Sequence, residues 1–233
     1  MKGSLKCKFA QNCYGGYCIP VSSIHRPAAR IVSNGGVYEK ETIDFIRKYH
    51  DGGDIVHAGT YFGDFLPGIS KACSSEQRIW AFEPNPESFH CAEVTILLNK
   101  IKNVCLKNGG LGNVETSMVF ETSDKIGKPL GGGSYFNIGA SRIGDKNRVP
   151  IFTIDNEVPK DRTVSIIQLD VEGCEEIALI GGIKTIERCK PILILEVNPK
   201  SRLLTGEFFK KTIIGMGYKK IRKIHSNIVY SVR

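Results

Sequence analysis

The feature that most constrains the fold is a strand, a glycine turn and a helix start within residues 54–64, Asp-Ile-Val-His-Ala-Gly-Thr-Tyr-Phe-Gly-Asp. Residues 54–58 have the composition of a short buried strand, and Gly59 and Gly63 mark the turn that follows it. Because glycine has no Cβ, the backbone N–H groups of such a turn can approach a ligand closely. The segment therefore predicts a ligand site at the carboxyl end of this strand.

A second predicted strand, over 78–82, ends at Glu83, 20 positions after Gly63. In a Rossmann-like fold, an acid at the tip of the second strand binds ribose, because its two oxygens can accept from two adjacent hydroxyls. The turn and the acid together predict a nucleoside site, and their spacing leaves open which nucleoside it binds.

The chain from residue 51 alternates between strands and helices. Strands are predicted over 54–58, 78–82, 103–107, 164–169 and 192–197. Helices are predicted over 63–73, 86–99, 175–188 and 206–216. Short strands rich in Ile, Val and Leu between helices are typical of a doubly wound parallel sheet, so the predicted class is α/β. The last two strands, over 218–223 and 227–232, read as an antiparallel hairpin.

Two further parts stand apart from this alternation. Residues 1–50 predict a small cap of a β-hairpin (5–9 and 17–21), a short element (28–32) and a helix (38–49). We therefore expect a cap over 1–50 and a Rossmann-like domain over 51–233. Strands over 115–121 and 149–154 flank a glycine-rich segment, 127–136, which is long enough to serve as a lid over a substrate.

Composition restricts the setting of the protein. Lys and Arg exceed Asp and Glu by 8, which allows anionic partners, although Lys-rich edge strands account for such an excess equally well. Residues 1–20 lack the apolar core of a secretory signal, and no apolar run is long enough to span a membrane. We expect a soluble cytoplasmic protein whose eight scattered cysteines are free thiols. Nothing in the sequence indicates its oligomeric state.

Four motifs in order resemble the FkbM family of S-adenosylmethionine-dependent O-methyltransferases, which have the class I fold. They are His-Ala-Gly-Thr-Tyr-Phe-Gly-Asp-Phe (57–65), Ala-Phe-Glu-Pro-Asn-Pro (81–86), Gln-Leu-Asp-Val-Glu-Gly-Cys-Glu (168–175) and Pro-Ile-Leu-Ile-Leu-Glu (191–196). A mostly parallel sheet with a C-terminal antiparallel hairpin is the sheet plan of that class. The resemblance runs from about Val37 to Asn198.

The resemblance implies S-adenosylmethionine as cofactor and assigns residues to its parts. Glu83 would hold the ribose, the 108–111 segment would border the adenine, and the glycine turn would lie beneath the methionine part. The implied cofactor-binding residues are Gly59, Thr60, Tyr61, Gly63, Asp64, Glu83, Pro84, Asn85, Gly110, Leu111 and Asp170.

One position departs from this class of fold. The first residue of the glycine motif is usually an acid that helps to bind the cofactor's ammonium group, and here it is His57. The acid could instead be supplied by Asp64, Glu39 or Asp170. Alternatively, His57 is a core residue whose hydrogen bonds are satisfied within the protein.

The implied reaction is methyl transfer to a hydroxyl of a sugar, glycan or polyketide-like metabolite. Such a transfer needs alignment of the acceptor and a base for its proton. Candidate catalytic residues are Asp170, Glu172 and Glu196, which all follow central strands. Candidate acceptor contacts are Gly132, Ser134 and Tyr135, the last together with Phe136 as a surface for a sugar ring.

We expect no metal in the site. The alternative is Mg²⁺ held by Asp170, Glu196 and Asn198, whose hard oxygen ligands suit this ion. A zinc site of Cys7, Cys13, Cys18 and His25 is disfavoured, because none of these cysteines forms a C-x-x-C pair.

Three other functions remain open. An RNA methyltransferase is compatible with the basic charge, but the chain lacks the Asn/Asp-Pro-Pro-Tyr/Phe motif of amine-methylating enzymes and a recognisable RNA-binding appendage, so we expect no nucleic-acid partner. A nicotinamide oxidoreductase should carry the tighter G-x-G-x-x-G motif. A non-catalytic nucleoside-binding protein of the same fold would account for His57.

Overall fold

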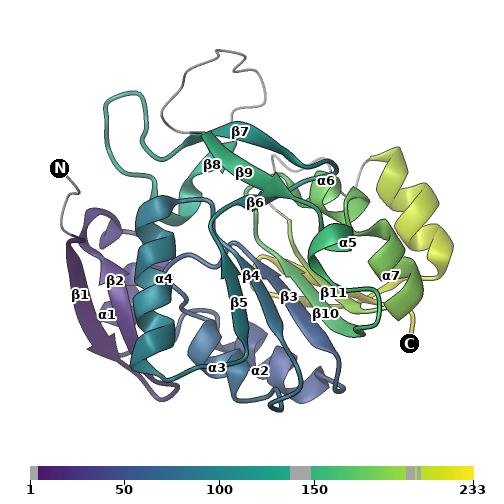
Figure 1. The fold of residues 1–233 in the computed structure, drawn as a ribbon, viewed down its shortest axis with the longest axis horizontal. Coiled ribbons are helices and arrows are strands. Elements are labelled where there is room, and N and C mark those ends of the chain that lie inside the picture. Colours follow the sequence, from purple (N-terminus) through teal and green to yellow (C-terminus); the bar gives the residue numbers. More distant parts are fainter. Residues whose placement is uncertain (1–4, 137–147, 198–202, 204–205) are drawn as a thin grey trace.

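The computed structural model describes residues 5–136, 148–197, 203 and 206–233. Its centre is a seven-stranded sheet in the order β12-β13-β11-β10-β3-β4-β5 (Figure 1). The strands are β3 (Asp54–Ala58), β4 (Ile79–Phe82), β5 (Val104–Lys107), β10 (Val164–Leu169), β11 (Ile192–Glu196), β12 (Lys219–Ile224) and β13 (Asn227–Ser231).

The predicted sheet is confirmed. The pairs β11–β10, β10–β3, β3–β4 and β4–β5 are parallel, whereas β13 runs antiparallel to both β11 and β12. The strand β12 forms an edge, and Lys219, Lys220, Arg222 and Lys223 on it are exposed. The basic stretch seen in the sequence therefore lies on an edge strand, where charged side chains discourage pairing with another chain.

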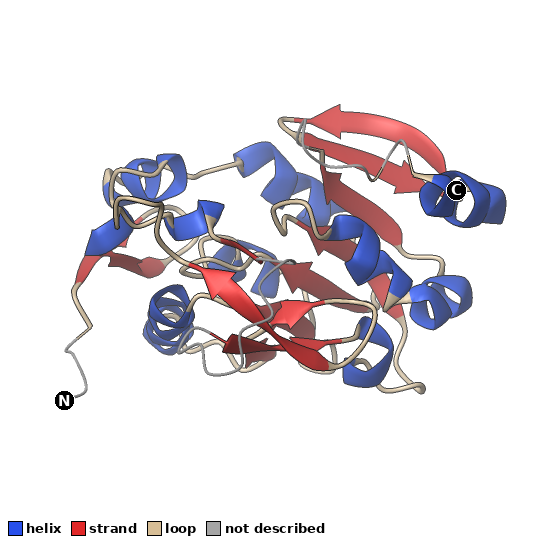
Figure 2. Ribbon diagram, turned by 90° about the horizontal axis from the view of Figure 1, so that it is seen from above, coloured by secondary structure: helices blue, strands red, loops and turns tan. Residues whose placement is uncertain are grey.

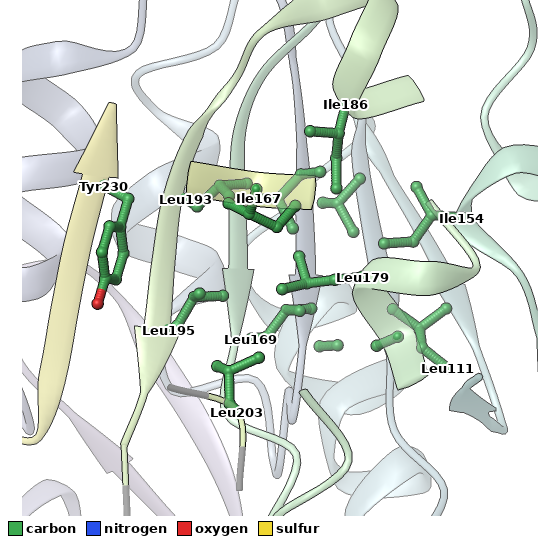
Figure 3. Close-up of a cluster of buried hydrophobic side chains, with 14 of the residues drawn as sticks. Leu111, Ile154, Ile167, Leu169, Leu179, Ile186, Leu193, Leu195, Leu203 and Tyr230 are labelled. Atoms are coloured by element: carbon green, nitrogen blue, oxygen red, sulfur yellow. The ribbon is translucent and has the colours of Figure 1, made fainter. Parts of the chain in front are cut away.

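The two faces of the sheet bury separate apolar clusters, because successive side chains of a strand point to opposite faces. On β3, Val56 and Ala58 belong to one cluster and Ile55 to the other. Figure 3 shows part of the first cluster, in which Leu169 and Leu195 pack with Leu179 and Ile186 of the covering helices. Seen from above, helices lie on both sides of the strands (Figure 2).

The helices α2 (Lys40–Tyr49), α3 (Leu66–Ser70) and α4 (Pro86–Leu98) pack around the second cluster or beside it. Helix α4 begins at Asn85, whose side-chain oxygen accepts from the N–H groups of Glu87 at 3.0 Å and Ser88 at 3.4 Å. These two bonds satisfy donors that the first helical turn leaves unpaired. The backbone N–H of Asn85 also donates to the carboxyl group of Glu83, so the start of α4 helps to hold the predicted ribose-binding acid in place.

Three predicted helices differ from the structure. The helix predicted over 63–73 is shorter at both ends, as α3 spans only Leu66–Ser70. The helix predicted over 175–188 is two helices, α6 (Glu175–Ile180) and α7 (Ile183–Cys189), with α5 (Ile154–Glu157) beside them. They separate at Gly181, where a Cβ would lie 1.9 Å from the carbonyl oxygen of Gly112. The helix predicted over 206–216 contains a π-helical turn, η3 (Phe209–Ile213), and a 3₁₀ turn, η4 (Ile214–Met216).

A second sheet, of order β6-β9-β7-β8, adjoins the carboxyl end of β5. It consists of β6 (Gly110–Leu111), β7 (Thr116–Glu121), β8 (Tyr135–Phe136) and β9 (Arg148–Phe152). The strand predicted over 149–154 was too long at its end, because Ile154 begins α5. The two-residue strands β6 and β8 are too short for a periodic pattern in the sequence. Between β7 and β8 lies the 3₁₀ turn η2 (Gly131–Gly133).

The N-terminal hairpin is present as β1 (Cys7–Gln11) and β2 (Gly16–Pro20), followed by η1 (Val21–Ser23) and α1 (Pro27–Ser33). The hairpin packs on α4, where the hydroxyl of Thr95 accepts from the N–H of Cys18 at 3.0 Å. Helix α2 instead packs in the cluster under β3 and β4. The division of the chain at residue 50 stays a prediction.

Within the described ranges, no helix combines the length and apolar composition that crossing a membrane requires. All eight cysteines are free thiols.

Candidate functional site

A cavity of about 220 Å³ lies at the carboxyl ends of β3, β4, β10 and β11. This is the edge of a doubly wound sheet where ligands bind, because loops from several strands converge there. Most residues singled out from the sequence line it, namely Gly59, Tyr61, Asp64, Glu83, Pro84, Gly110, Leu111, Gly132, Ser134, Asp170, Glu172 and Glu196.

Four predicted site residues are not in the cavity lining. Thr60 is buried in the turn, with its N–H donating to the carbonyl of Phe82 at 3.2 Å. Gly63 packs against α4, and Asn85 serves as the cap of that helix. Tyr135 is 48% exposed and pairs with Glu121 in the second sheet.

The glycine turn has its shape because of the neighbouring strand. Gly59 has φ +83°, and a Cβ there would lie 1.9 Å from the carbonyl oxygen of Asp170. Only glycine permits β3 and the end of β10 to approach this closely. The turn therefore brings the first motif and the Asp170 motif together at one wall of the cavity.

Glu83 lies at the centre of the hydrogen bonding in this wall. Its Oε2 accepts from the N–H of Tyr61 and its Oε1 from the N–H of Asn85, each at 2.7 Å. Tyr61 has φ +53°, a left-handed conformation that turns its N–H toward the carboxylate. Burial raises the pKa of Glu83 to about 8, although the two N–H groups lower it. The carboxylate is thus held rigidly at the edge of the cavity.

The segment after β5 forms an apolar wall next to Glu83. The side chain of Asn108 donates to the carbonyl of Glu83 at 2.8 Å and so joins the ends of β5 and β4. A Cβ at Gly110 would lie 2.4 Å from the Phe136 ring, so the absence of a side chain lets that ring cover the segment. Phe136 in turn contacts Phe120, with ring centroids 4.8 Å apart.

His57 is buried on β3, and its ring stacks on Phe65 with centroids 5.3 Å apart. Its Nδ1 forms a hydrogen bond with Oε1 of Gln168, the residue opposite it in β10. Burial lowers the pKa of His57 to about 4, so the ring is neutral at pH 7. Its Nε2 is buried and has no hydrogen-bond partner among the described residues. His57 is therefore a buried residue with one ring nitrogen hydrogen-bonded and the other not, rather than a core histidine with both nitrogens satisfied.

Further carboxyl groups line the cavity and act on one another's pKa values. Burial, and next the carboxylate of Glu196 beside it, raise the pKa of Asp170 well above its usual range. Burial, and next the charge of Glu39, raise the pKa of Asp64 to about 7. Glu172 has φ +51° and also lines the cavity. Several acids therefore face one space, which favours a positively charged ligand.

Glu175 has a structural role. Its Oε1 accepts from the N–H groups of Val171 at 3.3 Å and Gly173 at 3.1 Å, which stabilises the turn between β10 and α6.

The glycine-rich segment lines the cavity and packs against the N-terminal part of the chain. A Cβ at Gly131 would lie 2.6 Å from the Cβ of Ser23, and one at Gly133 would lie 2.1 Å from Nη2 of Arg26. The hydroxyls of Ser23 and Tyr61 are 2.5 Å apart. The glycines are thus needed for contact between the segment and η1, and they place Gly132 and Ser134 over the cavity.

Some lining residues escaped the sequence argument, namely Arg26, Tyr38, Phe120 and Gln168. Gln168 could have been found by aligning the two neighbouring strands, since it stands opposite His57. Arg26 and Tyr38 lie in the N-terminal segment, outside any motif, so only the folded chain brings them here.

The described residues contain no group of three or more His, Cys, Asp or Glu side chains that could hold a metal ion. Of the three residues considered for Mg²⁺, Asp170 and Glu196 lie together, and Asn198 is outside the described residues.

Comparison with known proteins identifies the family to which the chain belongs. The family model described as "Methyltransferase FkbM domain" matches residues 57–214, more than half of the chain. Among curated proteins, none matches the sequence.

Two solved structures resemble the chain in fold. A methyltransferase FkbM from Methylobacillus flagellatus KT is 17% identical with a TM-score of 0.53, and the match covers 77% of this chain and 43% of that one. Trm5b from Pyrococcus abyssi is 12% identical with a TM-score of 0.50, and the match covers 98% of this chain and 56% of that one. The chain thus spans about half the length of these relatives, or less.

The family match spans the glycine turn, Glu83, Asp170 and Glu196, which are the residues that form the walls of the cavity. The resemblance drawn from the sequence and the predicted α/β class are thereby confirmed. The chain belongs to the FkbM methyltransferase family.

Proposed function

We propose that the protein transfers the methyl group of S-adenosylmethionine to a hydroxyl of a sugar, glycan or polyketide-like metabolite. The observation that carries the proposal is the excess of acidic over basic side chains in the cavity. Among the residues that the structure describes, six carboxyl groups line it, from Glu39, Asp64, Glu83, Asp170, Glu172 and Glu196, against one guanidinium, that of Arg26.

This charge distribution selects among nucleoside cofactors. The chain as a whole has a formal charge of +8, so an acidic cavity within it is a local property of the site. S-adenosylmethionine carries a sulfonium and an ammonium against one carboxylate, and its net positive charge suits the acids. A nicotinamide dinucleotide carries two phosphates, which the same acids would repel. The charge thus supports the methyl donor over the oxidoreductase alternative.

The residues present fit the parts of this donor. Glu83 has its carboxylate oriented by two backbone N–H groups and would accept from the ribose hydroxyls. The wall of Pro84, Gly110 and Leu111, covered by Phe136, would hold the adenine. On this reading Phe136 faces the donor rather than an acceptor sugar. When bound, the donor supplies an electrophilic methyl group on its sulfonium.

The acids that follow β10 and β11 would supply the base. A hydroxyl acceptor must lose its proton as the methyl group is transferred, and a base works best when its pKa lies near the working pH. Burial and the neighbouring Glu196 raise the pKa of Asp170, which moves it in that direction. Asp170 would therefore take the proton, with Glu196 beside it to share the charge and Glu172 at the rim.

The first test is calorimetric binding of S-adenosylhomocysteine, the demethylated donor, with NAD as comparison. We expect micromolar affinity for the former and none measurable for the latter. Absence of binding to both would refute the enzyme assignment and favour a protein that has lost the cofactor.

The second test separates binding from catalysis and identifies the acceptor class. Transfer of a labelled methyl group is measured to pooled sugars and glycans and, in parallel, to total RNA. Asp170→Asn should lower turnover by about 10²- to 10⁴-fold with little change in S-adenosylhomocysteine affinity. Labelling of RNA alone would refute the hydroxyl acceptor proposed here and support an RNA methyltransferase. Loss of activity in EDTA would support a required Mg²⁺ ion.

A further inference from the structure

Two charged residues that line the cavity come from outside the family match. Arg26 immediately precedes α1 and Glu39 immediately precedes α2, whereas the matched region begins at His57. Both belong to the N-terminal segment and carry opposite charges. A ligand group that has both charges, such as an amino acid, would be complementary to them. The inference below rests on the proposed function, since it concerns the amino-acid part of the same donor.

His57 leaves an unsatisfied acceptor in this part of the cavity. Because Nδ1 donates to Oε1 of Gln168, Nε2 carries a lone pair and no proton. This nitrogen is buried and unpartnered among the described residues, and the side chain lines the cavity. A buried acceptor without a partner is unfavourable, and a ligand that donates to it removes this cost. It can accept from an ammonium N–H but, being neutral, supplies no charge to it.

Glu39 can supply the missing charge. Its backbone has φ +45°, and its Oε2 accepts from the hydroxyl of Thr42 at 3.0 Å and the side-chain amide of Asn227 at 2.8 Å. Both donors reach Oε2, and the residue lines the cavity. The carboxylate acts on Asp64, whose pKa it helps to raise. A cation placed between these two acids would relieve their repulsion.

Arg26 provides the opposite charge. Its guanidinium packs against η2 so closely that a Cβ at Gly133 would lie 2.1 Å from Nη2. It is the only permanently positive side chain among the described residues that line the cavity. Guanidinium groups bind carboxylates with two parallel hydrogen bonds.

We propose that Glu39, together with Asp64 and Nε2 of His57, binds the ammonium of the donor's amino-acid group, and that Arg26 binds its carboxylate. The N-terminal segment thereby takes over the role of the acid that His57 replaces. Arg26 and Glu39 are specificity residues, because they recognise a part of the donor that takes no part in the transfer.

The experiment compares two ligands that share the adenosine. S-adenosylhomocysteine has the amino-acid group, and 5′-methylthioadenosine lacks it. Affinities are measured by calorimetry for the wild type, Glu39→Gln and Arg26→Gln. The matched controls are Glu41→Gln and Arg30→Gln, which change the same residue types at exposed positions nearby.

We expect Glu39→Gln and Arg26→Gln each to weaken S-adenosylhomocysteine binding by about 10- to 100-fold, with 5′-methylthioadenosine affinity and both controls within about twofold of wild type. Equal losses for both ligands, or no loss, would overturn the inference while leaving the proposed function intact. A wild type that binds neither ligand would overturn both. Because the two variants act on separate elements, either one tests the claim if the other fails to fold.

Discussion

Replacing Glu83 by Gln should change the stability of the ligand-free protein with opposite sign at acidic and alkaline pH. The Glu83 carboxylate is 6% exposed, and both its oxygens accept from backbone N–H groups. Its pKa is raised by burial from 4.5 to about 8. For an acid whose pKa rises on folding, stability is greatest below the unfolded value and falls as the pH rises toward the folded value.

The magnitude follows from these two pKa values. One pKa unit corresponds to about 1.4 kcal/mol. The raised pKa of Glu83 therefore lowers the free energy of unfolding, relative to an acid with an unshifted pKa, by about 4 kcal/mol at pH 8 and about 1 kcal/mol at pH 5. Gln removes this cost, but its NH₂ group then faces one of the two N–H donors, at a cost of about 1–3 kcal/mol. Glu83→Gln should therefore be about 1–3 kcal/mol more stable than wild type at pH 8, and up to about 2 kcal/mol less stable at pH 5.

The assay is urea unfolding of both proteins at pH 5, 6.5 and 8, followed by the fluorescence of Trp80 on β4. Glu115→Gln, which changes an exposed carboxylate, is the control and should leave the difference near zero throughout. The variant should also bind S-adenosylhomocysteine about 10- to 100-fold more weakly, since the ribose loses a charged acceptor. A stability difference that is the same at pH 5 and pH 8 would refute the burial argument.

Three further outcomes are expected. Gly59→Ala should lower the free energy of unfolding by more than about 3 kcal/mol, because its Cβ would meet the Asp170 carbonyl at 1.9 Å. Gly127→Ala, with a similar φ of +81° and open space around it, should lower it by only about 1–2 kcal/mol. Equal losses in urea unfolding would contradict this. Asn85→Ala should cost about 0.5–2 kcal/mol through loss of the α4 cap, and an unchanged midpoint would show that the cap contributes nothing. S-adenosylhomocysteine binding at pH 7 should release protons, because the ammonium lowers the raised pKa of Asp64; a binding enthalpy that does not depend on the ionisation enthalpy of the buffer would exclude this linkage.

Local patterns predicted the central sheet well, because its strands are short apolar runs between turns. The bounds predicted for β3 and β10 agree with the structure, and those of β4, β5 and β11 differ by one residue at one end. The prediction was wrong where tertiary contacts interrupt a pattern. Helical periodicity runs through Gly181, but the approach of the Gly112 carbonyl ends α6 there.

In the candidate site, too, some features could be predicted from the sequence and others could not. The glycine turn, Glu83, Asp170 and Glu196 could be placed from the sequence because parallel strands bring their carboxyl ends to one edge. The neutral state of His57 could not, because it depends on burial and on Gln168 across the sheet.

The sequence by itself determined the α/β class, the family and the cavity wall of the glycine turn and Glu83, since these depend on patterns within short segments. Only the tertiary structure decided that Arg26 and Glu39 share a cavity with residues far along the chain, and that acids from three strand ends and α2 shift one another's pKa values. The physical reason is that charge interactions depend on distance and burial in space, which the order of residues does not record.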